Sequence, residues 1–312
     1  MKLGIVVPCY NEQDVLRETS VRLLAVLDRL TAAGKIDAAS RIFFIDDGSR
    51  DRTWPLIEAL GAEDARIGGI KLSRNRGHQN ALLAGLFTAG GDALVSIDAD
   101  LQDDVDVIEQ MVDEHLGGAD VVYGARRRRD TDTAFKRMTA KLFYRLMRLL
   151  GGELIDNHAD FRFMSRRAIE ALKDFKEVNL VLRGLVPLIG FPSAIVYYDR
   201  VERAAGYSKY PLRRMISLAL EGITSFSVGP LRLISVIGTI VFALSMLMSG
   251  YIVAVKLFSG RAIPGWASTV LPVYLLGGIQ ILCIGVIGEY IGKIYKEAKA
   301  RPRYIIEKSF NL

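Results

Sequence analysis

The chain has 312 residues, of which 50% are hydrophobic and 24% are charged, and its formal net charge is +6. So large an apolar fraction excludes a disordered or low-complexity chain, and so many charges are unusual in a transporter with many spans. The mean hydropathy of +0.23 is in turn high for a wholly soluble enzyme. These figures predict a globular domain joined to a small membrane part.

The cysteine content and the N-terminus indicate the compartment. Two cysteines, Cys9 and Cys283, are too few to staple a chain of this length, which favours a reducing, cytosol-facing context. Charged residues interrupt the N-terminus and no apolar signal-peptide core follows, so no signal peptide is expected.

From residue 1 to about 199, short apolar runs alternate with amphipathic helical patterns. Four of the runs are predicted to be buried strands, each followed by polar or turn residues: 3–7, 41–45, 67–72 and 93–97. Alternation of this kind predicts an α/β domain with a mostly parallel sheet. Its ligands are expected at the carboxyl ends of the strands.

Acidic turns follow the first two predicted strands. Residues 8–12 read PCYNE and residues 46–49 read DDGS. Carboxylates at one edge of a sheet can accept hydrogen bonds from the N–H of a base or from ribose hydroxyls. Turn and N-cap chemistry explains either motif alone equally well.

The fourth predicted strand ends in DADLQD, residues 98–103. The side chains of Asp98, Asp100 and Gln102 alternate along extended chain and can converge on one hard cation, Mg²⁺ or Mn²⁺. Such an ion keeps coordination positions for a substrate diphosphate and stabilises charge on a leaving phosphate. A lone DxD is weak evidence, but after a buried strand and two upstream motifs it becomes strong.

Competing signatures are missing from the sequence. It contains neither GxGxxG after a predicted strand nor GxxxxGK[ST], which disfavours dinucleotide oxidoreductases and P-loop enzymes. The histidines His78, His115 and His158 have no HExxH motif or cysteine companions. Zinc chemistry is therefore not expected.

Basic segments follow the acidic motifs. Arginines occupy residues 126–129, and residues 200–210 read RVERAAGYSKY. Arginine binds phosphate through two N–H groups and lysine as a point charge, although residues 127–129 fit a solvated surface equally well. Residues 135–149 form a basic amphipathic pattern that suits either a membrane interface or packing on the sheet. Residues 211–229 are the better candidate for an interfacial helix.

Two long runs near the C-terminus carry no formal charge. Residues 233–255 and 262–288 comprise 23 and 27 residues, and about 20 apolar residues span a bilayer. We expect a two-helix transmembrane hairpin, with a pair of buried core helices as the alternative. Lysines and arginines flank the hairpin on its outer sides, which predicts that both termini and the α/β domain are cytosolic.

The ordered set PCYNE, DDGS and DADLQD resembles the family 2 glycosyltransferases, whose catalytic domain has the Rossmann-like GT-A fold. Within that family the chain is similar, over essentially its whole length, to polyprenyl-phosphate glycosyltransferases: dolichyl-phosphate mannose synthase and, more closely, bacterial bactoprenol glucosyltransferases. The resemblance implies four parts. A GT-A domain would occupy residues 1–210, a juxtamembrane amphipathic helix 211–231, two transmembrane helices 232–292 and a cytoplasmic basic tail 293–312.

The resemblance also implies roles for particular residues. The nucleotide sugar would be bound by Pro8, Tyr10, Glu12, Asp47, Asn75 and Asp98. The metal and the diphosphate would be held by Asp98, Asp100 and Gln102. The acceptor phosphate would be bound by Arg126, Arg200, Arg203, Ser208 and Lys209. Asp160 matches a position with a catalytic base role, whereas the residues alone allow it merely to orient Arg162 or the sugar hydroxyls.

The implied reaction is an inverting transfer of a hexose to undecaprenyl or another polyprenyl phosphate, for cell-envelope glycosylation. Glucose from UDP-glucose is the leading donor, Mg²⁺ or Mn²⁺ the cofactor, and the cytoplasmic face of the bacterial inner membrane the place. A galactose donor, GDP-mannose, UDP-GlcNAc and a modified arabinose donor stay open. No nucleic-acid partner is implied, and Gly277, Gly278, Gly285 and Gly288 would permit close helix packing, within the hairpin or in a homo-oligomer.

Two rival interpretations concern other functions. A processive polysaccharide synthase shares the donor domain, but such enzymes normally carry a QxxRW motif that neither Trp54 nor Trp266 provides. A non-catalytic membrane adaptor would bind nucleotide or lipid without turnover, and the intact acidic motifs argue against it.

Overall fold

The computed structural model describes residues 1–126, 158–177, 182–199 and 266–312, together with single residues between 234 and 251. The chain divides into two units. The first comprises Met1–Tyr144, Glu153–Lys209 and Arg301–Leu312, and the second Arg145–Gly152 and Tyr210–Ala300.

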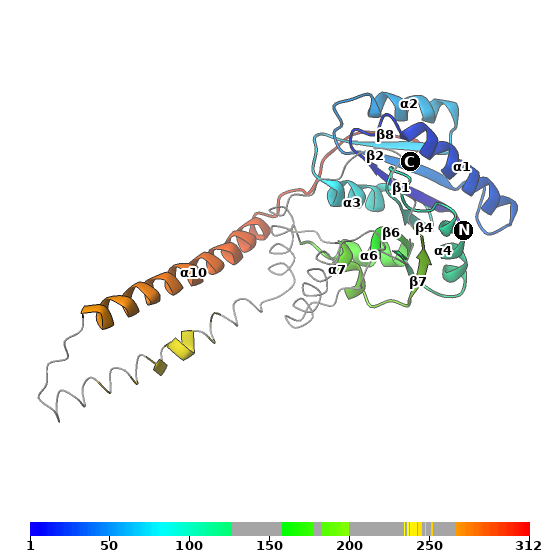
Figure 1. Cartoon of the computed structure of the whole chain (residues 1–312). Helices are drawn as coiled ribbons and strands as arrows, with labels where there is room; N and C mark the ends of the chain where they lie inside the picture. The colour runs from blue at the N-terminus through cyan, green and yellow to red at the C-terminus, as the bar shows by residue number, and fades with distance from the viewer. Residues whose placement is uncertain are drawn as a thin grey trace, which may run out of the picture. The chain divides into compact units, whose positions relative to one another are not determined.

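The first unit is built on an eight-stranded sheet with the strand order β7-β5-β6-β4-β1-β2-β3-β8. Its parallel block consists of β1 (Leu3–Cys9), β2 (Arg41–Asp46), β3 (Ile67–Leu72) and β4 (Ala93–Ser96). The intervening helices are α1 (Leu16–Ala32), α2 (Thr53–Glu63) and α3 (His78–Thr88), which return the chain so that successive strands run the same way. The predicted α/β class with a mostly parallel sheet is confirmed (Figure 1).

Three further strands of this unit, β5, β6 and β7, lie on the β4 side of the parallel block. The chain continues through α4 (Val107–Leu116), β5 (Val121–Arg126), β6 (His158–Ser165), α6 (Arg166–Lys173), α7 (Leu182–Leu188) and β7 (Ser193–Tyr198). Strand β6 lies antiparallel between β4 and β5, with Ser96 paired to Arg162. Two residues further along this antiparallel register, Asp98 and Asp160 come opposite each other. The fold therefore joins the end of β4 to a segment more than 60 positions later in the chain.

A hydrophobic cluster covers one face of the sheet. It combines alternate residues of β1 with apolar residues of α1, α2 and α4, among them Leu23, Ile57 and Ile108, all of which are buried. The period-2 alternation of β1 meets the helical spacing of α1 here, as the sequence pattern predicts. Burial of both faces of the central strands explains why they are nearly continuous apolar runs.

The C-terminal residues form an edge strand that the sequence did not predict. Strand β8 (Ile306–Phe310) pairs antiparallel with β3, so the segment predicted as a basic tail contributes to the sheet of the first unit (Figure 1). The Phe310 ring packs edge-on against Trp54, with ring centroids 5.8 Å apart. It fits because residues 61 and 69 are glycines, where a Cβ would lie 2.3 and 2.4 Å from the ring.

The described part of the second unit is mainly α10 (Trp266–Ala298). No helix in the part of the chain that the structure describes is long and apolar enough to cross a membrane. The predicted multi-pass location in the bacterial inner membrane is therefore contradicted, and the predicted transmembrane hairpin and the integral-membrane assignment are not supported. Pro272 and Gln280 interrupt the apolar run of α10, and lysines and glutamates occupy its last turns. The predicted helix 211–231 and most of the first predicted span lie outside the described residues.

Candidate active site at the carboxyl ends of the strands

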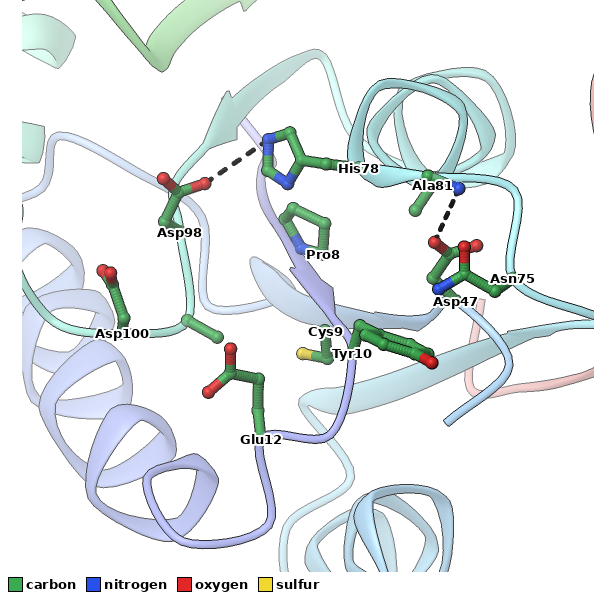
Figure 2. Close-up of a pocket in the computed structure, with 12 residues that line it drawn as sticks. Pro8, Cys9, Tyr10, Glu12, Asp47, Asn75, His78, Ala81, Asp98 and Asp100 are labelled. Atoms are coloured by element: carbon green, nitrogen blue, oxygen red, sulfur yellow. Dashed lines mark hydrogen bonds and ion pairs between the residues drawn. The ribbon is translucent and has the colours of Figure 1, made fainter. Parts of the chain in front are cut away.

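A cavity of about 290 Å³ opens at the carboxyl ends of β1, β2 and β4, at the lower end of the range for ligand pockets. All six residues predicted to bind the nucleotide sugar line it, together with Asp100 (Figure 2). Asp98, Asp100 and Glu12 lie on one side, and Asp47 and Asn75 lie on the other. The remaining lining residues are Cys9, Gly77, His78, Ala81 and Ala99.

The loop after β1 is held in place by the turn after β2. The backbone N–H of Asn11 donates to Ser49 Oγ (3.0 Å), and the N–H of Glu12 donates to Thr53 Oγ1 (2.9 Å). In return, the N–H of Arg50 donates to Asn11 Oδ1 (2.9 Å). These bonds leave Tyr10 at the cavity with 41% of its surface exposed. A ring so exposed is available to stack against a flat ligand.

Asp47 shapes the loop that carries Asn75. Its Oδ1 accepts the backbone N–H of Arg76 (2.7 Å) and its Oδ2 that of Gly77 (2.8 Å). Burial raises the pKa of Asp47, and these two bonds offset part of that rise. The neighbouring Gly48 has a φ of 67°, and a Cβ there would lie 2.6 Å from the backbone of Arg74. The DDGS motif thus fixes residues 74–77 against the end of β2.

The DxD carboxylates both face the cavity (Figure 2). Burial raises the pKa of Asp98 to about 6; His78 opposes this rise, and the nearby carboxylates of Asp103, Asp160 and Asp100 add to it. A bound cation would reduce the electrostatic repulsion among these carboxylates. Gln102 is 3% exposed and does not line the cavity, and its Oε1 has no hydrogen-bond partner among the described residues.

The donor set fits a hard divalent cation in part. Within the described ranges, no three His, Cys, Asp or Glu side chains are grouped to hold a metal. Two carboxylates, Asp98 and Asp100, are nevertheless enough for Mg²⁺ when substrate phosphates supply the other ligands. Gln102, whose side-chain oxygen has no hydrogen-bond partner among the described residues, follows Asp100 by two positions in the sequence.

Asp160 is almost buried, with its side chain 9% exposed. Its carboxylate accepts hydrogen bonds from Gln79 Nε2 (3.0 Å) and from Arg183 Nε (3.2 Å) and Nη2 (3.3 Å). Burial alone would raise its pKa, but His78, Arg183 and Arg162 together hold the pKa well below its usual range. Asp160 is therefore a firmly ionised carboxylate, which makes it a weak proton acceptor.

His78 links Asp160 to the DxD motif. Its Nε2 is 3.5 Å from Asp98 Oδ1 and 3.5 Å from Asp160 Oδ2 (Figure 2 shows the first contact). Burial lowers the pKa of His78, yet the two carboxylates outweigh it and the pKa is raised. In the sequence, His78 belongs to no motif that predicts this role. The sequence feature that could have indicated its role is its position directly after the 74–77 turn.

Of the five predicted acceptor residues, the structure describes only Arg126. Arg126 lies at the end of β5, away from the cavity lining, and its Nη2 donates to Asp103 Oδ1 (3.0 Å). The hydroxyl of Tyr198 donates to the same oxygen (2.5 Å). Arg200, Arg203, Ser208 and Lys209 lie outside the described residues. Arg183, which sequence reasoning missed, is the cation that the structure adds beside Asp160.

Comparisons with known proteins identify the family. The family model described as Glycosyl transferase family 2 matches residues 4–173. The uncharacterized glycosyltransferase YkoT of Bacillus subtilis (strain 168) is 51% identical over 307 residues, covering 98% of this chain and 91% of that protein. The SfII prophage-derived bactoprenol glucosyl transferase of Shigella flexneri is 40% identical over 312 residues, covering 99% and 98% of the two chains.

Among solved structures, glucosyl-3-phosphoglycerate synthase from Mycobacterium tuberculosis is 20% identical with a TM-score of 0.47, covering 72% of this chain and 76% of that one. That likeness bears on neither substrate nor metal. The family match and the whole-length relatives do establish the class of protein and its GT-A-like fold. The chain belongs to glycosyl transferase family 2, and it is a glycosyltransferase.

Proposed function

We propose that the protein transfers a sugar from a nucleotide sugar to a polyprenyl phosphate, with glucose from UDP-glucose as the leading donor. The observation that carries the proposal is that one cavity gathers the six predicted donor-binding residues and Asp100. Support for the acceptor class comes from relatives described as bactoprenol glucosyl transferases that match along nearly the whole chain.

In this proposal the cavity holds the nucleotide sugar by its three chemical parts. The Tyr10 ring stacks on the base, and polar groups of the Asp47–Asn75 side hold the ribose. The diphosphate lies toward Asp98 and Asp100. A Mg²⁺ or Mn²⁺ ion held by these two carboxylates would neutralise charge on the diphosphate as it leaves.

The transfer needs little help from a base. A phosphate monoester has a second pKa of about 6, so the acceptor is largely a dianion at neutral pH. One of its oxygens attacks C1 of the sugar, and the bond between C1 and the β-phosphate oxygen breaks. The electron pair of that bond leaves with the nucleoside diphosphate, and a single displacement inverts the configuration at C1.

Asp160 therefore has a positioning role in this proposal. A carboxylate whose pKa is held low by His78, Arg183 and Arg162 is a poor base but a strong anchor for cations and hydroxyls. It fixes His78 and Gln79 of α3 and Arg183 of α7. In this proposal the transferred sugar lies beside these side chains.

The test is a transfer assay with the purified full-length protein in detergent. Undecaprenyl phosphate, Mg²⁺ and a panel of labelled nucleotide sugars are supplied, namely UDP-glucose, UDP-galactose, UDP-GlcNAc and GDP-mannose. We expect a lipid-extractable labelled product from one donor, strongest with UDP-glucose, and its loss on chelation of the metal. No lipid-linked product from any of these donors would refute the proposed function. Nucleotide binding without turnover would instead indicate a binding protein.

A further inference from the structure

Arg183 carries a guanidinium with one edge committed and the other available. Its Nε and Nη2 donate to the two oxygens of Asp160, at 3.2 and 3.3 Å. A guanidinium is planar, so an arginine bound through the Nε–Nη2 edge presents Nη1 and the outer N–H of Nη2 on the opposite side. The side chain is 47% exposed. It therefore offers a second, solvent-accessible fork of donors whose orientation Asp160 fixes.

The local charge favours an anion at that fork. Asp160 is the carboxylate between two guanidinium groups, that of Arg183 and that of Arg162, which is 1% exposed. The Nε and Nη2 atoms of Arg162 have no hydrogen-bond partner among the described residues. One negative charge is thus shared by two positive ones, and an added anion beside Arg183 would balance the cluster.

The position of Arg183 separates it from the donor cavity. His78 lines the cavity and contacts Asp98 on one side and Asp160 on the other, each at 3.5 Å. Arg183 lies beyond Asp160 and does not line the cavity. Three successive contacts, Asp98–His78, His78–Asp160 and Asp160–Arg183, therefore lead from the DxD motif, where the donor diphosphate would bind, to a cation outside the donor pocket.

An acceptor phosphate must meet these same requirements. It must approach the sugar from outside the donor cavity, it is a dianion at neutral pH, and it is best bound by a fork of two N–H donors. The geometry points to Arg183 as a residue that binds the phosphate of the acceptor, with Asp160 as the residue that orients it. This inference rests on the proposed function and adds a phosphate contact to the predicted acceptor residues, which come from the resemblance.

The experiment compares two Michaelis constants in the full-length protein: that for undecaprenyl phosphate and that for the nucleotide sugar giving the highest wild-type rate. Arg183→Gln removes the charge and the fork. We expect the KM for the lipid phosphate to rise about tenfold or more, as for loss of a charge-assisted bidentate contact. The KM for the nucleotide sugar should stay within about twofold, because Arg183 lies outside the donor cavity. Arg183→Lys keeps the charge without the fork and should fall between.

Arg17 provides a matched control. It also donates through two nitrogens to one carboxylate, that of Glu63, at 3.1 and 3.0 Å, and it is 58% exposed. Arg17→Gln should leave both Michaelis constants unchanged. Thermal melts of all three variants identify any loss of folding, and Arg183→Lys keeps the test open if Arg183→Gln fails to fold.

The outcomes separate the two proposals. An active wild-type protein whose lipid-phosphate KM is unchanged in both Arg183 variants would overturn the inference alone. So would a rise confined to the KM of the nucleotide sugar, which would place Arg183 on the donor. A wild-type protein that forms no lipid-linked product would overturn the proposed function and, with it, this role of Arg183.

Discussion

The parallel block and the antiparallel strip of the sheet, namely β6 where it pairs with β4 and β5, contribute to the site in different ways. Strands β1, β2 and β4 of the parallel block each deliver a short motif at their carboxyl ends, and the three motifs meet in one cavity. Strand β6 of the antiparallel strip delivers Asp160, whose partners come from α3 and α7. The first arrangement depends on local sequence. The second depends on strand register, and its residues are held by charge.

The largest effect is expected in the parallel block. Asp100→Asn removes one of two carboxylates that would hold the metal, while the shape of the side chain is kept. We expect the transfer rate to fall by about 10³-fold, comparable to the loss of a key electrostatic group in other active sites. Steady-state transfer at saturating Mg²⁺ measures it.

Asp104→Asn is the matched control for that change. Asp104 lies four residues further along the same loop, outside the donor cavity, and caps the N–H of Asp106. Its substitution should leave the transfer rate within about twofold. Equal losses in both variants would show that the loop, and not the DxD carboxylates, sets the rate.

The next effect belongs to the antiparallel strip and concerns stability. Asp160→Asn leaves the buried Arg162 and the adjacent Arg183 without their anion, so we expect the free energy of unfolding to fall by about 3 kcal/mol. Urea denaturation followed by circular dichroism measures it. A loss below about 0.5 kcal/mol, typical of surface substitutions, would contradict the view that charge holds this part of the site.

The pH dependence of that loss follows from the lowered pKa of Asp160. A carboxylate whose pKa is lower in the folded than in the unfolded state stabilises the fold above its unfolded pKa, about 3.9. The contribution is lost as the pH falls through the folded pKa. The stability difference between wild type and Asp160→Asn should therefore not decrease from about pH 8 to 5, where protonation of His78, whose pKa Asp160 helps to raise, adds to it, and it should shrink only below about pH 4. A difference that shrinks between pH 8 and 6 would contradict a lowered pKa.

The contrast between the two regions explains what could be predicted from the sequence. The parallel sheet brings the carboxyl ends of its strands together. The cavity residues that follow predicted strands could therefore be predicted: Pro8, Tyr10, Glu12, Asp47, Asn75, Asp98 and Asp100. His78 becomes a neighbour of Asp160 through the pairing of β4 with β6, and Arg183 through the packing of α7 on β6, so neither residue has a motif of its own. Gln102 fits the motif's spacing, but its side chain is buried away from the cavity lining.

Charge and hydropathy counts were less reliable than the motifs. The uncharged runs predicted two spans, whereas no described helix is long and apolar enough for one. The basic residues after 293 suggested a tail, whereas Ile306–Phe310 pairs with β3. A strand of five residues with two charges carries little local signal, and the slot at Gly61 and Gly69 for Phe310 helps to specify its place.

A smaller loss of stability is expected at this edge strand. Phe310 is half-buried against Trp54, so Phe310→Ala should lower the free energy of unfolding by about 2 kcal/mol, less than for a fully buried phenylalanine. Phe310→Leu should recover most of it. An unchanged melting temperature in Phe310→Ala would show that β8 does not contribute to the stability of the domain.

The smallest effect is expected at Tyr10. This residue is 41% exposed, and the base of the nucleotide is its proposed contact. Tyr10→Ala should raise the KM for the nucleotide sugar by about tenfold, since stacking on an aromatic ring contributes roughly 1–3 kcal/mol per base. Tyr10→Phe keeps the ring and should change that KM less than about twofold. Equal effects of the two substitutions would assign the role to the hydroxyl group and not to the ring.

The central claim is that the cavity at the carboxyl ends of β1, β2 and β4 is the donor site. An experimental structure of the full-length protein with UDP and Mn²⁺ tests it most directly, because the anomalous signal of manganese locates the ion independently. We predict the ion at the carboxylates of Asp98 and Asp100, with the uracil ring against Tyr10. Nucleotide or manganese bound elsewhere, with this cavity empty, would contradict the account.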